Sequence, residues 1–589
     1  MNYMEKKKSM KRFILAEKDK QAEAYAKALG SYQERKGVYH LTSSYLPGEL
    51  HIYAPEGHLF EYMEPEDNWD LAQLPLVDVP FQMTLAKGKK KRFETIYREV
   101  QWADEVIIAT DADREGERIA YSILSRIPGG KDKITSRLWG QSLSAEGIQA
   151  NFQALRDPRE TYNYYLEAEA RAQSDWLVGM NLSPLVTLTL QKQQRLARGK
   201  GTSLSVGRVQ TALVRVVVEN DTRIKNFQPQ SYWRLFFEDK AYQLGFVGTE
   251  TFDSSEEALM TARQLGNRLE VVEIADADHQ KLAPQLFKTS SLQWYCASQL
   301  KIDTKTSEEI LESLYLKGFI SYPRTGSAYI TEGEFSYLKY LVSDYQGLVS
   351  RVFEVENDQP RDLYVDAEQL DSEGHYAIIP TETLPNLFQL DRQERLIYEA
   401  IVKRTLLMFA GDYLYQTQTV TLASQDFAFN VKGRRNLSLG WTELADRPPR
   451  KDVFLPPFAV GQVLEGQFGV KEQFTKPPKR LTEAQLFGQV FDYYGLGTPA
   501  TRTDIFQKIL KRGYVKQDKK TGQLFPERKA YLLIDFMYDN EFSNPETTGD
   551  WEDFLKQIGQ GQLNPRDFVE AIKDKVKTQV ETVKEEGHF

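Results

Sequence analysis

Acidic side chains crowd one short segment of the chain, at Asp111, Asp113, Glu115 and Glu117. Asp111 and Asp113 are two residues apart, so in an extended turn their side chains face one small volume. Like charges that close repel each other, and a hard divalent cation such as Mg²⁺, which prefers carboxylate, water and phosphate oxygens, relieves the repulsion. The alternative is a helix N-terminus enriched in acids for its dipole. Because Asp111 and Asp113 precede the expected helix, we favour a metal site.

A tyrosine close to an arginine is the second candidate for chemistry. A tyrosine phenol has an ordinary pKa near 10 and is a weak nucleophile at neutral pH unless its anion is stabilised. Arg324 follows Tyr322 after one proline, and its permanent charge stabilises such an anion and grips a phosphate by paired hydrogen bonds. Taken alone, this pattern is weak evidence, because the chain has 31 tyrosines and many tyrosines only pack.

A long stretch of the chain lacks acids. No Asp or Glu occurs from Trp176 to Val218, and its basic residues include Lys192, Arg195, Arg198, Lys200, Arg208 and Arg215. A local field of one sign suits a nucleic-acid backbone even though the whole chain has a net charge of −9. Charge runs more often form an ordinary solvated face, and that alternative stays open. The basic cluster over residues 87–92 carries the same ambiguity.

Length and composition set limits on the class of protein. A chain of 589 residues is too long for one core and is expected to form several domains. The single cysteine, Cys296, excludes an intramolecular disulfide framework and a zinc module built on cysteines. Apolar runs fall short of the roughly 18 residues that a membrane span requires, and the basic start has no secretory apolar region. We therefore expect a cytoplasmic protein without a membrane partner.

Two strand-to-helix units are expected to position the acidic segment. The first is a strand over residues 12–16, followed by Glu17 and a helix of about ten residues that ends at Gly30. The second is a buried parallel strand over residues 105–110, which leads into the acids and then a helix. This pattern is typical of an open α/β sheet, whose sites lie at the carboxyl ends of its strands. Glu17 joins the acidic group if the two strands are neighbours.

The rest of the chain alternates helical and β-rich parts. Helical periodicity marks residues 145–220, and alternation of apolar and polar residues predicts half-buried strands over 231–280 and 411–475. The segment between these strands, 285–405, is mostly helical and contains Tyr322. Helices return from residue 480, so the β-rich part is expected to be one domain that a helical module interrupts.

The acidic segment resembles a known domain. Ile14-Leu15-Ala16-Glu17-Lys18 and the segment from Ala109 to Glu117 are similar to the TOPRIM domain of type IA DNA topoisomerases, which also occurs in primases and some nucleases. The resemblance implies that Glu17, Asp111, Asp113 and Glu115 surround Mg²⁺ and the reacting phosphate. It also implies that Lys18 protonates the leaving 3′ oxygen.

The tyrosine segment resembles the same family. Gly318-Phe319-Ile320-Ser321-Tyr322-Pro323-Arg324-Thr325 is similar to the active-site tyrosine segment of type IA topoisomerases and follows the TOPRIM motifs in the expected order. The resemblance implies that Tyr322 forms a 5′-phosphotyrosine bond with Arg324 as a catalytic partner. Such a bond conserves the phosphodiester energy, so religation needs no ATP, and the chain has no Gly-x-x-x-x-Gly-Lys-Ser/Thr loop.

Other family-like segments cover nearly the whole chain. His375, in the segment 374–381, matches a histidine near the reacting phosphate, which the resemblance makes catalytic. The DNA-binding residues that the resemblance implies are Arg171, Asp175, Ser205, Arg208, Gln210, Thr498 and Arg502. For His375 alone, a structural role is the ordinary alternative.

The fit is closest to the topoisomerase III branch, through residues 16–18, 57–59 and 377–381. Gly326 departs from the pattern, since relatives often carry an acid there, and Ser183-Pro184-Leu185 looks more like the topoisomerase I branch. Without further cysteines, the zinc ribbons that end many relatives are absent. Relatives commonly begin near Met10, so residues 1–9 are read as an extension.

The resemblance implies a multidomain α/β, helical and β-rich protein closed into a toroid. The expected parts are a Rossmann-like TOPRIM domain (1–155), a helical single-strand DNA groove domain (156–220 and 480–589), a β-rich arch (221–284 and 406–479) and an active-site tyrosine domain (285–405). The expected enzyme is a nucleoid-associated monomer that acts on single-stranded segments of negatively supercoiled or catenated DNA. The alternatives are a TOPRIM nuclease or primase and a non-catalytic single-strand DNA binder.

Overall fold

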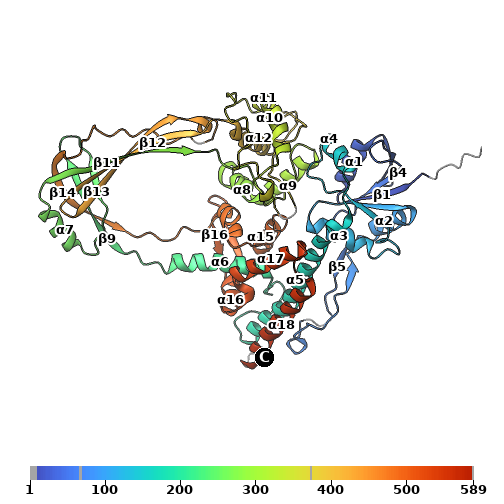
Figure 1. Ribbon diagram of the computed structural model, residues 1–589. Helices are drawn as coiled ribbons and strands as arrows, with labels where there is room; N and C mark the ends of the chain where they lie inside the picture. Colours follow the sequence, from blue (N-terminus) through green and yellow to red (C-terminus); the bar gives the residue numbers. More distant parts are fainter. Residues whose placement is uncertain (1–8, 66–68, 372–373, 447, 587–589) are drawn as a thin grey trace, which may run out of the picture.

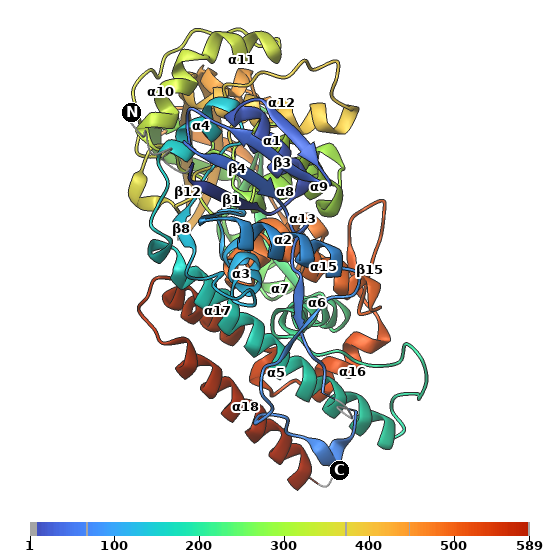
Figure 2. The same ribbon diagram turned by 90° about the vertical axis from the view of Figure 1, so that its right-hand side faces the viewer.

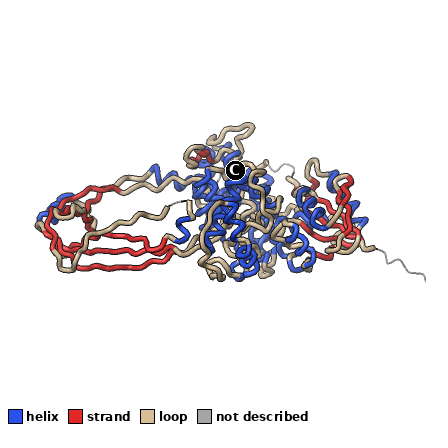
Figure 3. The backbone as a smooth tube through the Cα atoms, turned by 90° about the horizontal axis from the view of Figure 1, so that it is seen from above, coloured by secondary structure: helices blue, strands red, loops and turns tan. Residues whose placement is uncertain are grey.

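The computed structural model describes residues 9–65, 69–371, 374–446 and 448–586. Its parts follow one another around a ring: a sheet domain, a helical domain, a long β-rich arch and a helical module that contains Tyr322 (Figure 1). From above, the arch extends far from the other three parts (Figure 3). The toroidal multidomain fold expected from the sequence is therefore observed.

The sheet domain has six strands in the order β2-β3-β4-β1-β7-β8. In this order they span Tyr32–Arg35, Val38–Thr42, Glu49–Tyr53, Lys11–Ala16, Glu105–Ala109 and Ile134–Arg137. β1 lies between β4 and β7 and runs parallel to both. Side chains of β1 alternate between two cores, with Ile14 on one face and Phe13 and Leu15 on the other. Burial on both faces explains why β1 and β7 read as continuous apolar runs.

Helices cover both faces of this sheet. One face packs against α1 (Asp19–Leu29) and α4 (Ala145–Gln153), and the other against α2 (Lys90–Trp102) and α3 (Arg114–Leu124). α1 ends at Gly30, as the sequence predicts.

Residues 45–85 belong partly to the sheet domain and partly to the helical domain. They contain strand β4 of the main sheet and a hairpin of β5 (Phe60–Tyr62) and β6 (Met83–Leu85). The loop of that hairpin leaves the sheet and packs on the helical domain, where the Trp176 indole donates to the Met63 carbonyl at 3.0 Å. The expected TOPRIM domain of residues 1–155 therefore includes a segment whose apolar side chains belong to the core of the helical domain.

The helical domain is built on α5 (Tyr162–Lys192) and α6 (Arg208–Lys225). α5 has 31 residues and contains Pro184 in its later half. The late part of the chain adds α13 (Glu483–Gln485), α14 (Phe491–Tyr493), α15 (Arg502–Lys511), α16 (Arg528–Phe536), α17 (Pro545–Gly559), α18 (Pro565–Glu585) and the hairpin β15 (Val515–Gln517) and β16 (Leu524–Pro526). α17 and α18 pack along α5, as Figure 2 shows.

The arch ends in a closed barrel with the strand order β10-β13-β12-β11-β14-β9. In chain order the strands are β9 (Ser231–Asp239), β10 (Gly245–Gly248), β11 (Arg268–Lys281), β12 (Tyr413–Ser424), β13 (Phe427–Ser438) and β14 (Val463–Phe474). Strands from both sides of the inserted module pair with each other, so the predicted interrupted β domain is observed. The sequence did not predict helix α7 (Ser255–Gln264), which Ser254 caps.

The inserted module contains α8 (Thr289–Tyr295), α9 (Thr304–Leu316), α10 (Glu332–Tyr340), α11 (Val342–Leu348) and α12 (Arg392–Leu406). Tyr322 lies in the loop between α9 and α10. This loop begins at Gly318, whose φ is +75°, and an added Cβ there would lie 2.9 Å from the Leu143 carbonyl oxygen of the sheet domain. Glycine thus allows the tyrosine loop to touch the sheet domain.

Within the described residues, every helix is too short or too polar to cross a lipid bilayer.

Candidate active site

The carboxyl ends of β1 and β7 bring Glu17 and Asp111 together. Ala16 pairs in register with Ala109, and the Asp111 backbone amide donates to Glu17 Oε2 at 3.2 Å. Both side chains are buried. The condition that the sequence set for Glu17, that the two strands be neighbours, is met.

Asp113 serves two purposes at the start of α3. Its Oδ1 accepts from the Gly116 amide at 2.8 Å and caps the helix, while its Oδ2 accepts from the Tyr322 phenol at 2.7 Å. The helix-cap explanation therefore applies to Asp113, yet the same carboxylate also faces the tyrosine. An added Cβ on Gly116 would lie 2.2 Å from the Asp111 carbonyl oxygen. The first turn of α3 therefore requires glycine at this position to pack against the Asp111 backbone.

Tyr322 is buried, with 1% of its surface exposed, at the contact between the tyrosine module and the sheet domain. Its backbone amide donates to the Gln141 carbonyl at 2.7 Å. The sheet domain therefore binds both the backbone and the phenol of this residue. Burial, followed by the charges of Asp113 and Asp111, raises the pKa of Tyr322 well above its ordinary value, against the opposing effect of Arg324. The phenol is therefore neutral in this state.

Two cations converge on Asp111. Lys18 Nζ lies 3.1 Å from Asp111 Oδ2 and 2.6 Å from Glu312 of α9, and the Arg324 guanidinium lies 3.6 Å from the same Asp111 oxygen. Although burial alone raises it, the pKa of Asp111 is held below its ordinary value by Lys18 and Arg324. Burial and then Asp111 raise the pKa of Glu17 to about 8.

The carboxylates fit a divalent cation in part. Burial and then repulsion by the nearby Asp111 and Asp113 raise the pKa of Glu17, and an added cation would relieve that repulsion. Glu115, the fourth predicted ligand, instead forms an ion pair with Arg171 and lies 3.4 Å from His58. In the part of the chain that the structure describes, no three His, Cys, Asp or Glu side chains are already arranged as metal ligands.

His375 lies beside the tyrosine, and Gln141 positions it. The two rings of Tyr322 and His375 have centroids 4.8 Å apart, and His375 Nδ1 is 2.8 Å from Gln141 Oε1. The Gln141 amide also donates to the Gly374 carbonyl at 2.7 Å. His375 is fully buried and its Nε2 has no hydrogen-bond partner among the described residues. The sequence did not single out Gln141, because no motif or spacing distinguishes it.

The acid-free stretch does not produce a field of one sign at Arg208, one of its basic residues. Arg208 is 1% exposed and lies between Asp175 at 3.2 Å and Glu552 of α17 at 2.7 Å. Arg195 and Arg215 also form ion pairs, with Asp535 and Glu219. Acids from other segments thus neutralise much of the acid-free stretch, whereas Lys192, Arg198 and Lys200 stay exposed.

The other predicted DNA-binding residues contact one another within the helical domain. Gln210 donates to the Ser205 carbonyl at 2.9 Å, and Arg171 lies 3.6 Å from Asp175. Arg502 pairs with Asp492 at 2.6 Å and donates to the Leu496 carbonyl at 3.0 Å, which fixes the loop before α15. Thr498 is half-buried in that loop.

A cavity of about 220 Å³ joins these parts. Its walls come from the acidic turn, the tyrosine loop, the loop before α15 and helix α17, and they include Asp113, Arg324, Thr498 and Arg502. Asp113 and Arg324 thus meet Thr498 and Arg502 at this cavity, although they come from segments far apart in sequence.

Comparisons with known proteins identify the class. The fold is similar to full-length topoisomerase I from Thermotoga maritima, with a TM-score of 0.71 and 22% identity over 96% of this chain and 90% of that one. Residues 159–570 match the DNA topoisomerase family and residues 12–137 match the Toprim domain. The chain therefore belongs to the type IA DNA topoisomerases, which are isomerases acting on DNA.

Curated relatives carry two names. DNA topoisomerase 3 from Bacillus licheniformis is 27% identical over 98% of this chain and 82% of its own length. DNA topoisomerase 1 from Alkalihalophilus pseudofirmus is 28% identical over 97% of this chain and 84% of its own length. The expected resemblance to topoisomerase III is confirmed, and a relative named topoisomerase 1 is equally similar. These matches support neither the nuclease or primase nor the simple binding protein.

Proposed function

We propose that Tyr322 is the nucleophile of this topoisomerase and that it cuts one DNA strand in a split site. The observation that carries the proposal is the 2.7 Å hydrogen bond from the Tyr322 phenol to Asp113, two residues 209 positions apart on different domains. A tyrosine that only packs has no need of a buried carboxylate as partner. The neighbouring Lys18, Arg324 and His375 supply the proton donors and charge that a phosphoryl transfer requires.

The reaction exchanges one phosphoester for another. The Tyr322 oxygen bonds to the phosphorus, its proton leaves along the hydrogen bond to Asp113, and the bond to the 3′ oxygen breaks. Lys18, held in its charged form by Asp111 and Glu17, gives a proton to that 3′ oxygen. The strand is left with a 5′-phosphotyrosine link and a free 3′ hydroxyl. Because the number of phosphoester bonds is unchanged, religation reverses the step without ATP.

Glu17, Asp111 and Asp113 would hold Mg²⁺. When bound there, the ion supplies positive charge beside the phosphate oxygens and relieves repulsion among the three carboxylates. Arg324 lies 3.6 Å from Asp111 and can grip the same phosphate.

The expected substrate is a single-stranded segment of negatively supercoiled or catenated DNA. Tyr322 is almost completely buried beside a cavity of about 220 Å³, which is too small for a duplex. One chain contributes both the tyrosine and the carboxylates, so a monomer suffices for the reaction.

The test is relaxation of a negatively supercoiled plasmid with Mg²⁺ and without ATP, comparing the unchanged protein with Tyr322→Phe and Asp111→Asn. We expect relaxation to be lost in both variants while single-strand DNA binding persists. Tyr322→Phe removes only the attacking oxygen, and Asp111→Asn removes one charge from the carboxylate group. Nicking that survives Tyr322→Phe would point to a nuclease and contradict the proposal.

A further inference from the structure

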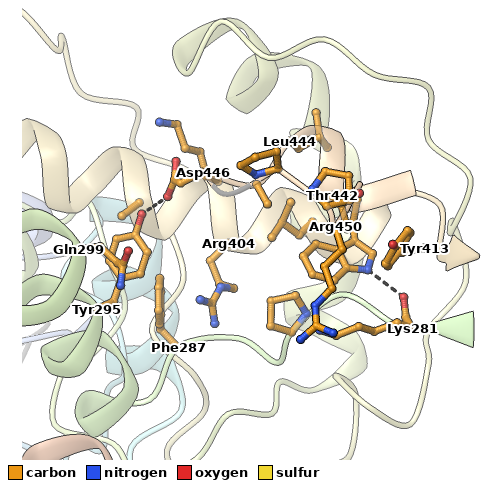
Figure 4. A pocket seen from close by; sticks show the side chains of 18 of the residues that line it. Lys281, Phe287, Tyr295, Gln299, Arg404, Tyr413, Thr442, Leu444, Asp446 and Arg450 are labelled. Atoms are coloured by element: carbon orange, nitrogen blue, oxygen red, sulfur yellow. Dashed lines mark hydrogen bonds between the residues drawn. The ribbon is translucent and has the colours of Figure 1, made fainter. Parts of the chain in front are cut away.

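A second cavity lies at the foot of the arch, where β11 and β12 meet the tyrosine module. Its volume is about 550 Å³, within the usual range for small-ligand sites. Figure 4 shows Lys281 and Tyr413 of the arch on one side and Phe287 and Tyr295 of the tyrosine module on the other, with Arg404 between them. The cavity therefore bridges two domains.

Aromatic rings and cations alternate around this cavity. The Arg404 guanidinium lies 4.0 Å from the Phe287 ring centroid, and that of Arg434 lies 3.6 Å from the Tyr415 ring centroid. Lys281 lies 5.7 Å from the ring of Trp441, whose indole donates to the Lys281 carbonyl. In proteins that bind single-stranded nucleic acid, aromatic rings stack on the bases and nearby cations bind the phosphates.

The charge balance of the lining favours an anion. Among the described residues, no carboxylate lies within 4.0 Å of the charged groups of Lys281, Arg404, Arg434 or Arg450. The acidic side chain in the described lining is Asp446, and it accepts a hydrogen bond from the Tyr295 phenol. The Arg434 guanidinium donates to the Tyr413 phenol at 2.7 Å, while its buried Nε has no hydrogen-bond partner among the described residues. Arginines without a carboxylate partner beside a cavity are suited to a phosphate.

We propose that this cavity binds a nucleotide, with its base stacked on the aromatic side chains and its phosphate held by Arg434 and Arg450. The nucleotide is either a unit of a DNA strand or a free mononucleotide, since both present the same base and phosphate. This site is separate from Tyr322 and takes no part in cleavage.

A short segment connects the cavity with the cleavage site. Phe287 lines the cavity, and two residues later the Thr289 hydroxyl donates to the Pro323 carbonyl at 2.6 Å in the tyrosine loop. Between them, Lys288 lies 2.9 Å from Asp492, the ion-pair partner of Arg502. A ligand that moves Phe287 therefore acts on a segment tied to both the tyrosine loop and the helical domain.

Photo-cross-linking tests the proposal on the full chain, with 5-iodo-2′-deoxyuridine 5′-monophosphate as probe and peptide mass spectrometry as readout. We expect label on Tyr295, Tyr413, Tyr415 or Trp441. Thymidine 5′-monophosphate should compete about tenfold better than thymidine, because charged hydrogen bonds to the phosphate are lost in the nucleoside. Tyr322→Phe should label as strongly as the unchanged protein, which separates this result from the proposed cleavage chemistry.

Variants of the cations decide the outcome. Arg450→Gln, at an exposed position, and Arg434→Gln should each reduce labelling, and together by roughly tenfold or more. Lys432→Gln, an exposed cation of β13 outside the cavity, should leave it unchanged. Circular dichroism checks that the variants are folded. Labelling confined to other residues, or unaffected by Arg450→Gln and Arg434→Gln, overturns the proposal.

A second cross-linking experiment, with the same iodouracil placed in a short DNA single strand, identifies the source of the nucleotide. If these aromatic residues are labelled at a lower concentration of the strand than of the mononucleotide, the site is assigned to DNA. Equal or stronger labelling by the mononucleotide assigns it to a free nucleotide, and either result supports the site.

Discussion

At the scale of single residues, the buried phenol of Tyr322 is the centre of the account. Asp113 accepts its hydrogen bond and helps to raise its pKa, so the nucleophile is kept neutral until charge is added beside it. In the proposed mechanism, a metal ion at the carboxylates would add the positive charge that lowers this pKa beside a DNA phosphate held by Arg324 and Lys18. The reactive state is thus expected only with substrate in place.

Gln141 offers a test of how the site is positioned. It bonds His375 and Gly374 through its side chain and Tyr322 through its carbonyl. Gln141→Ala should slow cleavage of a single-stranded oligonucleotide by roughly tenfold to a hundredfold, because small misplacements of reacting groups are costly. Single-strand binding, measured by fluorescence anisotropy, should change little.

Gln149→Ala is the matched control for Gln141. The Gln149 amide donates to the Ala28 carbonyl within the sheet domain at 2.8 Å and touches none of the site residues. Equal cleavage rates in the two variants would show that Gln141 does not position the tyrosine and histidine.

The sequence predicted site residues that belong to local motifs. It did not predict contacts between segments that are far apart in the chain. Lys18, Asp111 and Tyr322 were predicted together, and the structure brings them to one interface. Arg208 was expected on a basic surface, but its partner Glu552 comes from a helix more than 300 residues later. No pattern within the acid-free stretch shows that neutralisation.

At the scale of elements, the turn from β7 into α3 is the critical piece. Gly116→Ala would place a Cβ 2.2 Å from the Asp111 carbonyl oxygen and so displace both aspartates. We expect the free energy of unfolding to fall by about 1–3 kcal/mol, as in overpacked cores, and cleavage to be lost. Denaturant unfolding and oligonucleotide cleavage measure the two effects.

Gly179→Ala in α5 is the control for that turn. The nearest atom to an added Cβ there is the Val206 carbonyl oxygen, at 3.9 Å. Alanine should stabilise the helix by about 0.5–1 kcal/mol because it has the better helix propensity. A Gly116→Ala protein as stable and active as Gly179→Ala would refute the steric argument.

The predicted elements were correct where burial leaves a clear pattern of apolar residues in the sequence. β1 and β7 read correctly because both faces are buried. The full length of α5 was not predicted, because its later half is buried on several sides and contains Pro184, so it shows no amphipathic stripe. Helix α7 was not predicted because it lies within a β-rich region, although Ser254 followed by acids is a capping signal.

At the scale of the whole molecule, the proposed cleavage site lies across a contact between domains. Tyr322 and Lys18 form their key bonds with Asp113 and Glu312 across the contact of the tyrosine module and sheet domain. The arch joins the tyrosine module to the helical domain around the far side of the ring (Figure 1). Separating the module from the sheet domain after cleavage would part the two DNA ends while both stay attached to one protein.

This arrangement predicts which DNA is relaxed. If, as proposed, only a single strand reaches the buried tyrosine, negatively supercoiled plasmid should relax in steps of one in linking number. Positively supercoiled plasmid should stay unchanged unless it carries a single-stranded loop. Gel electrophoresis of topoisomers measures this, and relaxation of loop-free positive supercoils at an equal rate would contradict the single-strand requirement.

The most direct test of the account is to trap the covalent intermediate. A single-stranded oligonucleotide labelled at its 3′ end is incubated with the protein and Mg²⁺, denatured, and the labelled peptide is sequenced by mass spectrometry. We predict that the label, joined through a 5′ phosphate, resides on Tyr322 and is absent in Tyr322→Phe. A label on another residue, a 3′-phosphate linkage, or cleavage without any covalent adduct would contradict it.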